Sequence, residues 1–297
     1  MGFQLLSYFC GPFQFMHKRL PLCLVILVLS LGCKNSSNTS ETPGSITEPA
    51  TNDEPPAITY TVMNALPHDT SSYTEGLLMH DGKFYESSGA PQEYDKTRSI
   101  VGIVDPVTGK IAVKAELDRK KYFGEGIAII DNKLYQLTWK NFDGQIKKGF
   151  IYDLKTFKKL GEFDFPSNEG WGMTTDGKSL IMSDGSSNLT FLDPVTFKTN
   201  RILGVTDNNG AVGNINELEY VNGNILANIY ETPYIIRIDA NSGKVLGKAD
   251  FTSLVQEVKL KSTDAEYMNG IAYDSAKNKI YVTGKLWPNI YEVRLNN

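Results

Sequence analysis

Asp81-Gly82-Lys83-Phe84-Tyr85 begins a short pattern that returns four more times along the chain. The later copies are Asp131-Asn132-Lys133-Leu134-Tyr135, Asp176-Gly177-Lys178-Ser179-Leu180, Asn222-Gly223-Asn224-Ile225-Leu226 and Lys277-Asn278-Lys279-Ile280-Tyr281. The copies begin at residues 81, 131, 176, 222 and 277, so they stand 45 to 55 residues apart. A repeat of about 40–50 residues with several strands per unit is typical of a β-propeller. The chain is therefore predicted to be all-β, a five-bladed β-propeller.

Each full repeat reads as four strands. A Gly-containing apolar strand precedes the quoted pattern, whose Asp-Gly, Asp-Asn and Asn-Gly pairs suit tight hairpin turns. The fifth repeat stops after its third strand, residues 290–295, at the end of the chain. Residues 58–63 form a candidate strand at the other end, and we expect this N-terminal strand to pair with the last blade and close the ring. Residues 254–267 are the best candidate for a short helical or loop insertion.

Length and net charge limit the number of domains and the kinds of partner that the sequence allows. The chain has 297 residues, of which 41% are hydrophobic, and residues 57–297 are enough for one all-β domain with its own core. The formal net charge is −4. Nucleic-acid binding needs a clustered basic surface, so we expect no nucleic-acid partner.

The first 33 residues resemble an export signal. Lys18 and Arg19 precede an apolar run at 20–31 that is too short for a comfortable membrane span. The run ends at Leu31-Gly32-Cys33, which resembles a bacterial lipoprotein signal with Cys33 as the lipidated residue; ordinary secretion is the alternative. Residues 34–56 are polar and Pro-containing, and they read as a disordered tether. The sequence thus predicts an exported protein, periplasmic or anchored to the outer membrane as a lipoprotein.

Few residues are available for metal or nucleophilic chemistry. The cysteines are Cys10, Cys23 and Cys33, all in the leader, and the histidines are His17, His68 and His80. No pair of histidines has metal-ligand spacing, and a Ser-His-Asp triad would lack its base. We therefore expect no cofactor and no zinc. Carboxylate chemistry, a lysine, or a hard cation such as calcium held by oxygen ligands remain open.

Two sets of residues are predicted to meet at one mouth of the channel, because the start of one antiparallel strand lies beside the end of its partner. The starts of the inner strands carry Glu75, Glu125, Glu169, Asn216 and Asn269, with Trp171 just inside. The ends of the second strands carry Ser87-Ser88, Trp139, Asp184, Tyr230 and Lys285. Any one of these residues can serve packing instead. The whole set is too polar for channel filling and too aromatic for a bare ion site, which favours a ligand pocket.

At these positions the chain resembles the plant and bacterial type of glutaminyl-peptide cyclotransferase, a five-bladed propeller. The matching strings are Tyr73-Thr74-Glu75-Gly76-Leu77, Tyr122-Phe123-Gly124-Glu125-Gly126, Gln136-Leu137-Thr138-Trp139-Lys140, Glu169-Gly170-Trp171-Gly172, Ser183-Asp184-Gly185-Ser186, Asn216-Glu217-Leu218-Glu219, Asn269-Gly270-Ile271-Ala272 and Gly284-Lys285-Leu286-Trp287-Pro288. The resemblance runs from about residue 58 to 297. It implies conversion of the N-terminal glutamine of a peptide to pyroglutamate, with release of ammonia and without a metal.

The resemblance also implies a set of pocket residues. They are Tyr73, Glu75, Glu125, Trp139, Trp171, Asn216, Tyr230 and Lys285. The chain departs from the family pattern at Tyr73, where Phe is common, and at Tyr230, where Trp is expected. Both departures keep an aromatic wall and add a hydroxyl group. The expected partners are peptides or proteins that begin with glutamine, and the protein is expected to act as a monomer.

We assign hypothetical roles on this basis. The catalytic residues are Glu125, which carries the proton, and Lys285 and Asn216, which donate hydrogen bonds to the carbonyl oxygen. Trp139, Trp171 and Tyr230 clamp the curled glutamine side chain, and Glu75 holds its α-ammonium. Tyr73, Glu169 and Asn269 complete the predicted substrate-binding set. Glu75 and Glu169 remain alternatives to Glu125 as the proton carrier.

Two other functions remain open at this point. A calcium-dependent propeller hydrolase, such as a lactonase, would use Glu75, Glu125, Asn216 and Asn269 around a metal ion. Lys285 at the same mouth argues against it, because an ammonium group repels a divalent cation. The second alternative is a propeller that binds peptides without catalysis.

Overall fold

The computed structural model describes residues 54–141 and 148–296. The predicted export signal, including Cys33, and residues 34–53 of the predicted tether lie outside the described residues. Within the described ranges, no helix is both long enough and apolar enough to cross a membrane.

The described residues are mainly strands, and they include three antiparallel sheets of four strands each that follow chain order. The first holds β2 (Tyr73–His80), β3 (Lys83–Gly89), β4 (Ile100–Val104) and β5 (Ile111–Glu116). The second holds β6 (Tyr122–Ile130), β7 (Lys133–Asn141), β8 (Gly149–Asp153) and β9 (Lys159–Phe163). The third holds β10 (Met173–Thr175), β11 (Leu180–Met182), β12 (Asn188–Leu192) and β13 (Thr199–Gly204).

An eight-stranded sheet follows along the chain, in the order β16-β17-β18-β19-β1-β22-β21-β20. Its strands are β1 (Ala57–Pro67), β16 (Ile215–Val221), β17 (Asn224–Ile229), β18 (Tyr234–Asp239), β19 (Val245–Asp250), β20 (Met268–Asp274), β21 (Lys279–Gly284) and β22 (Asn289–Asn296). A small hairpin, β14 (Thr206–Asp207) with β15 (Gly210–Ala211), precedes it. The helix α1 (Thr252–Lys261) overlaps the insertion predicted at 254–267 and begins two residues before it.

The N-terminal strand pairs with the last strand of the chain, as predicted. Residues from Thr59 to Pro67 of β1 pair antiparallel with β22, with one irregularity after Val62. Ala57 and Ile58 pair with β19 in the parallel sense, so β1 joins the two halves of the eight-stranded sheet. Strand β1 is longer than the predicted 58–63, because its pairing with β22 continues to Pro67.

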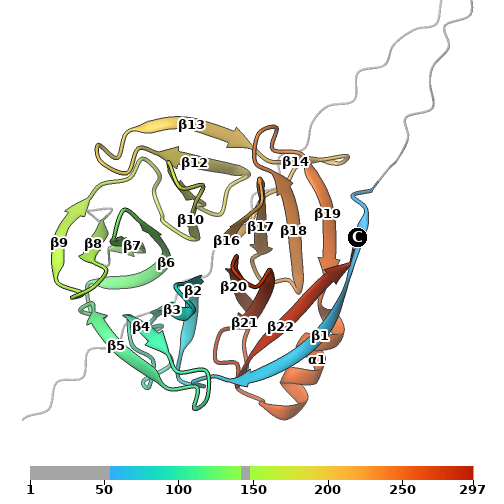
Figure 1. Cartoon of the computed structure of the whole chain (residues 1–297), viewed down its shortest axis with the longest axis horizontal. Helices are drawn as coiled ribbons and strands as arrows, with labels where there is room; N and C mark the ends of the chain where they lie inside the picture. Colours follow the sequence, from blue (N-terminus) through green and yellow to red (C-terminus); the bar gives the residue numbers. More distant parts are fainter. Residues whose placement is uncertain (1–53, 142–147, 297) are drawn as a thin grey trace, which may run out of the picture. The chain divides into compact units, whose positions relative to one another are not determined.

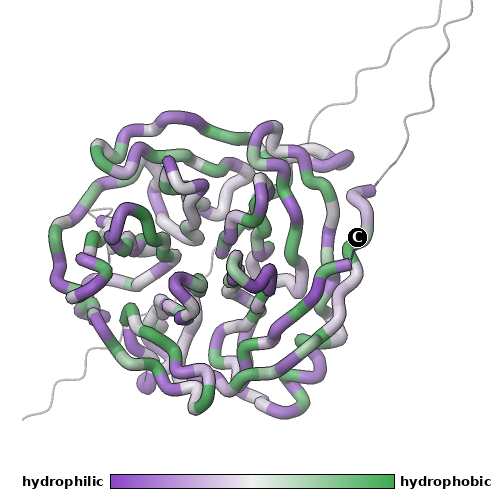
Figure 2. Tube along the Cα trace, viewed as in Figure 1, coloured by the Kyte–Doolittle hydropathy of each residue, from purple (hydrophilic) through white to green (hydrophobic). Residues whose placement is uncertain are grey.

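The first strand of each repeat lies innermost, and these strands follow one another around a central region (Figure 1). Strand β2 contacts β6, β6 contacts β10, β10 contacts β16, β16 contacts β20, and β20 contacts β2. Figure 2 shows hydrophobic segments alternating with hydrophilic ones along the strands, as expected for sheets that pack face to face. The fold is thus all-β and propeller-like.

The predicted hairpin turns have the expected backbone. The central residues of the β2–β3 turn, Asp81 and Gly82, both have positive φ, at 48° and 72°. Asp131 and Asn132 between β6 and β7 do the same, at 49° and 58°. Two consecutive positive φ angles are the signature of a type I′ turn, which matches the twist of the flanking strands.

A buried histidine after β1, His68, contacts both the first four-stranded sheet and the segment between β21 and β22. His68 follows β1, its Nε2 lies 2.8 Å from Oε2 of Glu86 on β3, and its Nδ1 lies 2.8 Å from the carbonyl oxygen of Trp287. The other carboxyl oxygen of Glu86 accepts hydrogen bonds from the hydroxyls of Ser72 and Thr74. Burial alone lowers the pKa of His68, but the neighbouring Glu86 outweighs it, so the pKa is raised above the ordinary value.

We expect His68→Gln to lower the free energy of unfolding by about 3 kcal/mol near pH 6, because it removes one partner of a buried charged pair. Since the pKa of His68 is raised in the folded state, its stabilising contribution is complete below the unfolded value of about 6.5. That contribution fades as the pH rises through the folded value. Denaturant unfolding of both proteins from pH 6 to pH 9 measures the difference.

His80→Gln is the matched control, because the His80 side chain is 37% exposed and close to the exposed Asp81. It should leave the free energy of unfolding unchanged from pH 6 to pH 9. A loss for His68→Gln that is equally large across the whole range would contradict a charged role for His68.

Candidate functional site

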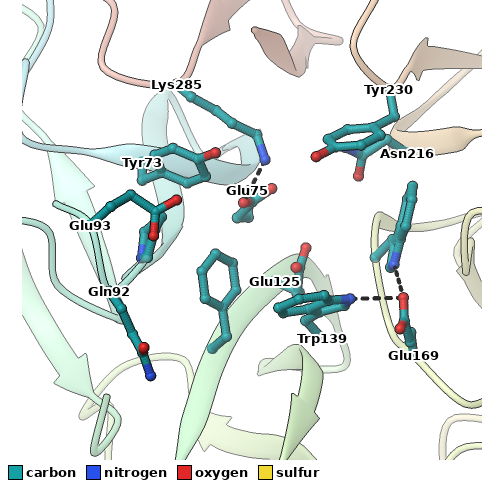
Figure 3. Close-up of a pocket in the computed structure, with 13 residues that line it drawn as sticks. Tyr73, Glu75, Gln92, Glu93, Glu125, Trp139, Glu169, Asn216, Tyr230 and Lys285 are labelled. Atoms are coloured by element: carbon teal, nitrogen blue, oxygen red, sulfur yellow. Dashed lines mark hydrogen bonds and ion pairs between the residues drawn. The ribbon is translucent and has the colours of Figure 1, made fainter. Parts of the chain in front are cut away.

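A pocket of about 660 Å³ opens where the inner strands begin (Figure 3). Every residue given a catalytic or substrate-binding role from the sequence lines it except Asn269, and Ser87, Ser88 and Asp184 of the wider predicted set do not line it. The lining residues are Tyr73, Glu75, Pro91, Gln92, Glu93, Phe123, Glu125, Trp139, Glu169, Trp171, Asn216, Tyr230 and Lys285. The predicted convergence of distant segments at one mouth is therefore what the structure shows.

The antiparallel pairing explains this convergence. Glu75, Glu125 and Asn216 lie near the starts of β2, β6 and β16. Trp139 lies near the end of β7, and Lys285 follows the end of β21. Because the start of an inner strand lies beside the end of its partner, both groups reach the same mouth.

Irregular pairing occurs at the residues that present the polar side chains. The β2–β3 register shifts between Thr74 and Gly76, which leaves Glu75 without a partner in the ladder. Similar shifts in β6 and β16 skip Glu125 and Asn216. Bulges of this kind redirect a side chain and are common beside active sites.

A buried ion pair lies at the bottom of the pocket. Nζ of Lys285 is 2.6 Å from Oε1 of Glu75, and both residues are at most 3% exposed. Nδ2 of Asn269 donates to Oε2 of Glu75 and to the carbonyl oxygen of Thr74, both at 3.0 Å. Burial raises the pKa of Glu75, and the ammonium group of Lys285 opposes that rise. Both carboxyl oxygens of Glu75 thus already have a protein partner.

Two tyrosine rings flank the same ammonium group. Nζ of Lys285 is 4.5 Å from the ring centroid of Tyr73 and 5.6 Å from that of Tyr230. A cation near the face of an aromatic ring is attracted by its quadrupole, and the attraction grows when water is excluded. Lys285 is therefore held from several sides, with its charge directed at the pocket.

Glu125 is the buried carboxyl group that lies free of such pairing. It is 5% exposed, and its side chain has no hydrogen-bond partner among the described residues. Burial raises the pKa of Glu125 well above the ordinary value. The negative charge of Glu75 raises it further, the Lys285 ammonium lowers it, and Glu169 adds a smaller increase. A carboxyl group with a raised pKa holds a proton more readily than an ordinary glutamate and is a candidate for proton exchange with a bound molecule.

Glu169 fixes two indole rings. Its Oε2 accepts a hydrogen bond from Nε1 of Trp139 at 2.7 Å and another from Nε1 of Trp171 at 3.0 Å (Figure 3). Trp139 packs edge-on against Phe123 at 5.8 Å, and Trp171 packs against Tyr230 at 5.2 Å. One carboxylate thus joins two aromatic pairs into a continuous wall.

Asn216 offers an unpaired acceptor. Its Oδ1 is buried and has no hydrogen-bond partner within residues 54–141 and 148–296. Its own carbonyl oxygen accepts from the hydroxyl of Ser183 at 2.7 Å, and that hydroxyl also accepts from the backbone N–H of Gly172. The backbones that carry Asn216 and Trp171 are therefore fixed by one serine. An unsatisfied buried acceptor costs about 1–3 kcal/mol, which a donor on a bound ligand would recover.

Several predicted positions do not reach the pocket. Asn269, predicted to bind substrate, is 1% exposed, does not line the pocket and donates to Glu75 from behind. Asp184 accepts hydrogen bonds from Ser186 in its own turn. Ser87 and Ser88 are buried, and their hydroxyls contact Gln136 and the carbonyl oxygen of Arg98.

Four lining residues were not predicted. Phe123 stands two residues before Glu125 in the same strand, and side chains two residues apart in a strand lie on the same face. Its place in the pocket could therefore have been predicted from that of Glu125. Pro91, Gln92 and Glu93 come from the connection between β3 and β4. Nothing in the repeat pattern marks that connection, because its position depends on contacts with residues far along the chain.

The fold and the pocket together define an all-β, propeller-like protein with a polar pocket walled by aromatic rings. A family model described as glutamine cyclotransferase matches residues 26–295. Glutaminyl-peptide cyclotransferase of Arabidopsis thaliana is 38% identical over 237 residues, which are 79% of this chain and 70% of that protein. The crystal structure of Myxococcus xanthus glutaminyl cyclase superposes with a TM-score of 0.72 at 31% identity, and the match covers 82% of this chain and 99% of the other. The chain belongs to the glutamine cyclotransferase family.

We expect Glu169→Ala to loosen both indoles, because each hydrogen bond to a charged acceptor contributes about 1.5–3 kcal/mol. The near-ultraviolet circular dichroism signal, which reports fixed aromatic packing, should fall. Glu169→Gln should keep part of the signal, because its amide oxygen still accepts from an indole.

Glu257→Ala is the control, since Glu257 pairs with Lys261 on the exposed side of α1. Its spectrum should match that of the unmodified protein. An unchanged spectrum for Glu169→Ala would show that the indoles are held by packing alone.

Proposed function

We propose that this protein is a glutaminyl-peptide cyclotransferase, which converts the N-terminal glutamine of peptides or proteins to pyroglutamate and releases ammonia. One observation supports this most strongly: Glu125, Asn216 and Lys285 meet in a single aromatic-walled pocket of a chain from this family. The relative from Arabidopsis thaliana and the structural neighbour from Myxococcus xanthus are both named for this activity.

The aromatic walls suit the first requirement of the reaction. The α-amine of glutamine must reach its own side-chain carbonyl carbon, so the side chain has to curl. Attack within one molecule is favoured when the reacting groups are held close, and this effect is a large part of the rate enhancement. Trp139 and Trp171, fixed by Glu169, and Tyr230 beyond them form a wall that holds the curled shape and excludes water.

Glu125 is the proposed proton carrier. In the reaction the α-nitrogen forms a bond to the side-chain carbonyl carbon, and the bond from that carbon to the amide nitrogen breaks. The ionised Glu125 accepts one proton from the attacking nitrogen and returns it to the leaving nitrogen, which departs as ammonia. Its raised pKa makes it a stronger base than an ordinary glutamate, as proton transfer from an amine requires. The enzyme ends in the state in which it began.

Lys285 and Asn216 are the proposed donors to the carbonyl oxygen, where negative charge develops. One hydrogen of the Lys285 ammonium goes to Glu75, which leaves two for the substrate. Since both oxygens of Glu75 are engaged, we assign Glu75 to positioning Lys285 rather than to binding the α-ammonium. The amide nitrogen of Asn216 is the proposed donor, which leaves its unpaired Oδ1 as a better acceptor than Glu75 for a hydrogen of the substrate's α-amine.

The ion pair argues against a calcium-dependent hydrolase. Calcium binding would need the carboxylate of Glu75, whose Oε1 lies 2.6 Å from the Lys285 ammonium. Two positive charges at that distance from one carboxylate repel each other strongly in a buried site.

We count the eight-stranded sheet as two blades joined edge to edge through β1 and β19, which makes the fold a five-bladed propeller. The circle of contacts among β2, β6, β10, β16 and β20 supports that count. Export, the lipid tether through Cys33, the monomeric state and the absence of a nucleic-acid partner stay predictions from the sequence.

Incubation of the protein with a Gln-initiated peptide should yield the pyroglutamyl peptide and ammonia. Mass spectrometry detects the first product and an ammonia assay detects the second. Glu125→Gln should lower kcat by about 10²–10⁴-fold with little change in KM, because it removes the proton carrier but keeps the side-chain shape.

A chelator is included in parallel and should leave the rate unchanged. Binding of the peptide without ammonia release would discard the proposed activity, and loss of activity with chelator would favour a metal-dependent enzyme. A near-normal rate for folded Glu125→Gln would move the proton-carrying role to another group.

Lys285→Met should lower kcat by about 10²–10³-fold, because a donor to the developing oxyanion is lost. Glu75→Gln with Lys285 intact is the comparison, since its amide oxygen still accepts from Lys285. We expect it to retain more activity than Lys285→Met. A rise in KM alone for Lys285→Met, with kcat unchanged, would indicate that Lys285 only binds the substrate.

A further inference from the structure

The connection between β3 and β4 forms part of the pocket mouth and has no part in the proposed chemistry. Pro91, Gln92 and Glu93 line the pocket from this connection. Gln92 and Glu93 are exposed, whereas Glu125 and Lys285 at the bottom are at most 5% exposed. In Figure 3 the side chain of Gln92 extends away from the pocket centre, while Glu93 lies on the Tyr73 side. Glu93 is thus the ionisable group that this connection places at the pocket.

One arginine fixes the backbone on both sides of Glu93. Nη2 of Arg119 donates to the carbonyl oxygen of Pro91 at 2.9 Å, and Nη1 donates to those of Asp95 and Thr97, both at 3.2 Å. The segment is also held internally, because the N–H of Thr97 donates to the carbonyl oxygen of Tyr94 at 3.0 Å. A charge on such an anchored segment is presented at a defined place.

A second anchor joins this segment to the far end of the chain. The hydroxyl of Tyr94 donates to Oε1 of Glu266 at 2.6 Å, and its ring packs 5.8 Å from that of Tyr73. The hydrogen bond with Glu266 raises the pKa of Tyr94 to about 12, and burial together with the charges of Glu266, Glu93 and Asp264 adds to that rise. Glu93 and Asp264 thus lie near enough to Tyr94 for their charges to act on its hydroxyl. The Glu93 carboxylate has no hydrogen bond or ion pair within the described part of the chain.

The direction of a bound peptide follows from the reaction. Both reacting groups belong to the first residue, which must lie at the bottom near Glu125 and Lys285. The rest of the peptide leaves through the mouth, so the second side chain passes the level at which Glu93 stands.

We infer that Glu93 is a specificity-determining residue that favours peptides with a lysine or arginine after the N-terminal glutamine. The inference rests on the proposed function and adds a substrate preference to it. It follows from an unpaired, exposed carboxylate, on an anchored segment, that lines the pocket from which the peptide leaves.

The test compares kcat/KM for three tripeptide amides, Gln-Lys-Ala, Gln-Ala-Ala and Gln-Glu-Ala, at low ionic strength. Exposed charge pairs are weak, so the unmodified protein should prefer the lysine peptide over the glutamate peptide by about tenfold in total. Glu93→Gln should reduce that ratio to about twofold, and Glu93→Lys should reverse it. Added salt should shrink the preference, because exposed charges are screened.

Asp95→Asn is the matched control, because Asp95 is an exposed acid on the same segment but does not line the pocket. It should leave the three rates in their original ratio. If Gln-Ala-Ala is cyclised but the ratios do not respond to Glu93, this inference is wrong and the proposed function stands. If none of the peptides is cyclised, the proposed function fails and the inference fails with it.

Discussion

At Gly126 and Gly172 neighbouring inner strands approach so closely that a side chain cannot fit between them. A Cβ atom on Gly126 would lie 2.3 Å from the backbone nitrogen of Met173, and one on Gly172 would lie 2.1 Å from the carbonyl oxygen of Asn216. The N–H of Gly126 donates to the carbonyl oxygen of Trp171 at 2.8 Å. This contact sets how near the strand starts come to one another, and the pocket exists because they come so near. A larger residue at either glycine would separate the groups that must act on one substrate.

The same crowding makes the site electrostatically strong. Removing Glu75 and Lys285 from water is costly, and their mutual attraction offsets that cost only because Asn269 satisfies the second carboxyl oxygen. Such a pair is weak evidence for stability. Its value lies in holding an ammonium group in a fixed place, where it needs no reorganisation when charge develops on a substrate. Glu125, left without a partner in the described part of the chain, keeps the freedom to exchange a proton.

The repeat, its hairpin turns and the closing strand were accessible from sequence, because they follow from local patterns and antiparallel geometry. Most of the pocket was accessible too, from the same geometry together with the family resemblance, which alone implied Tyr73. Asn216 and Asn269 show where that reasoning ends. Both begin an inner strand, yet Asn216 lines the pocket while Asn269 lies behind Glu75. Both strands skip two residues of the pairing at the same place, so the difference arises from neighbouring sheets: Asn269 donates to Glu75 and to the backbone of Thr74, which no single repeat encodes. The connection that carries Glu93 was missed for a related reason, since Arg119 and Glu266 hold it from elsewhere.

Depth within the pocket gives similar carboxyl groups different properties. At the bottom, low solvent exposure strengthens each charge, and the pKa of Glu125 responds to Glu75, Lys285 and Glu169 together. At the mouth, water and salt screen Glu93, so its charge can bias which peptide enters, as we infer, but can hardly alter the proton transfer that we propose at Glu125. Changes at the mouth can therefore alter substrate choice while the buried groups stay as they are.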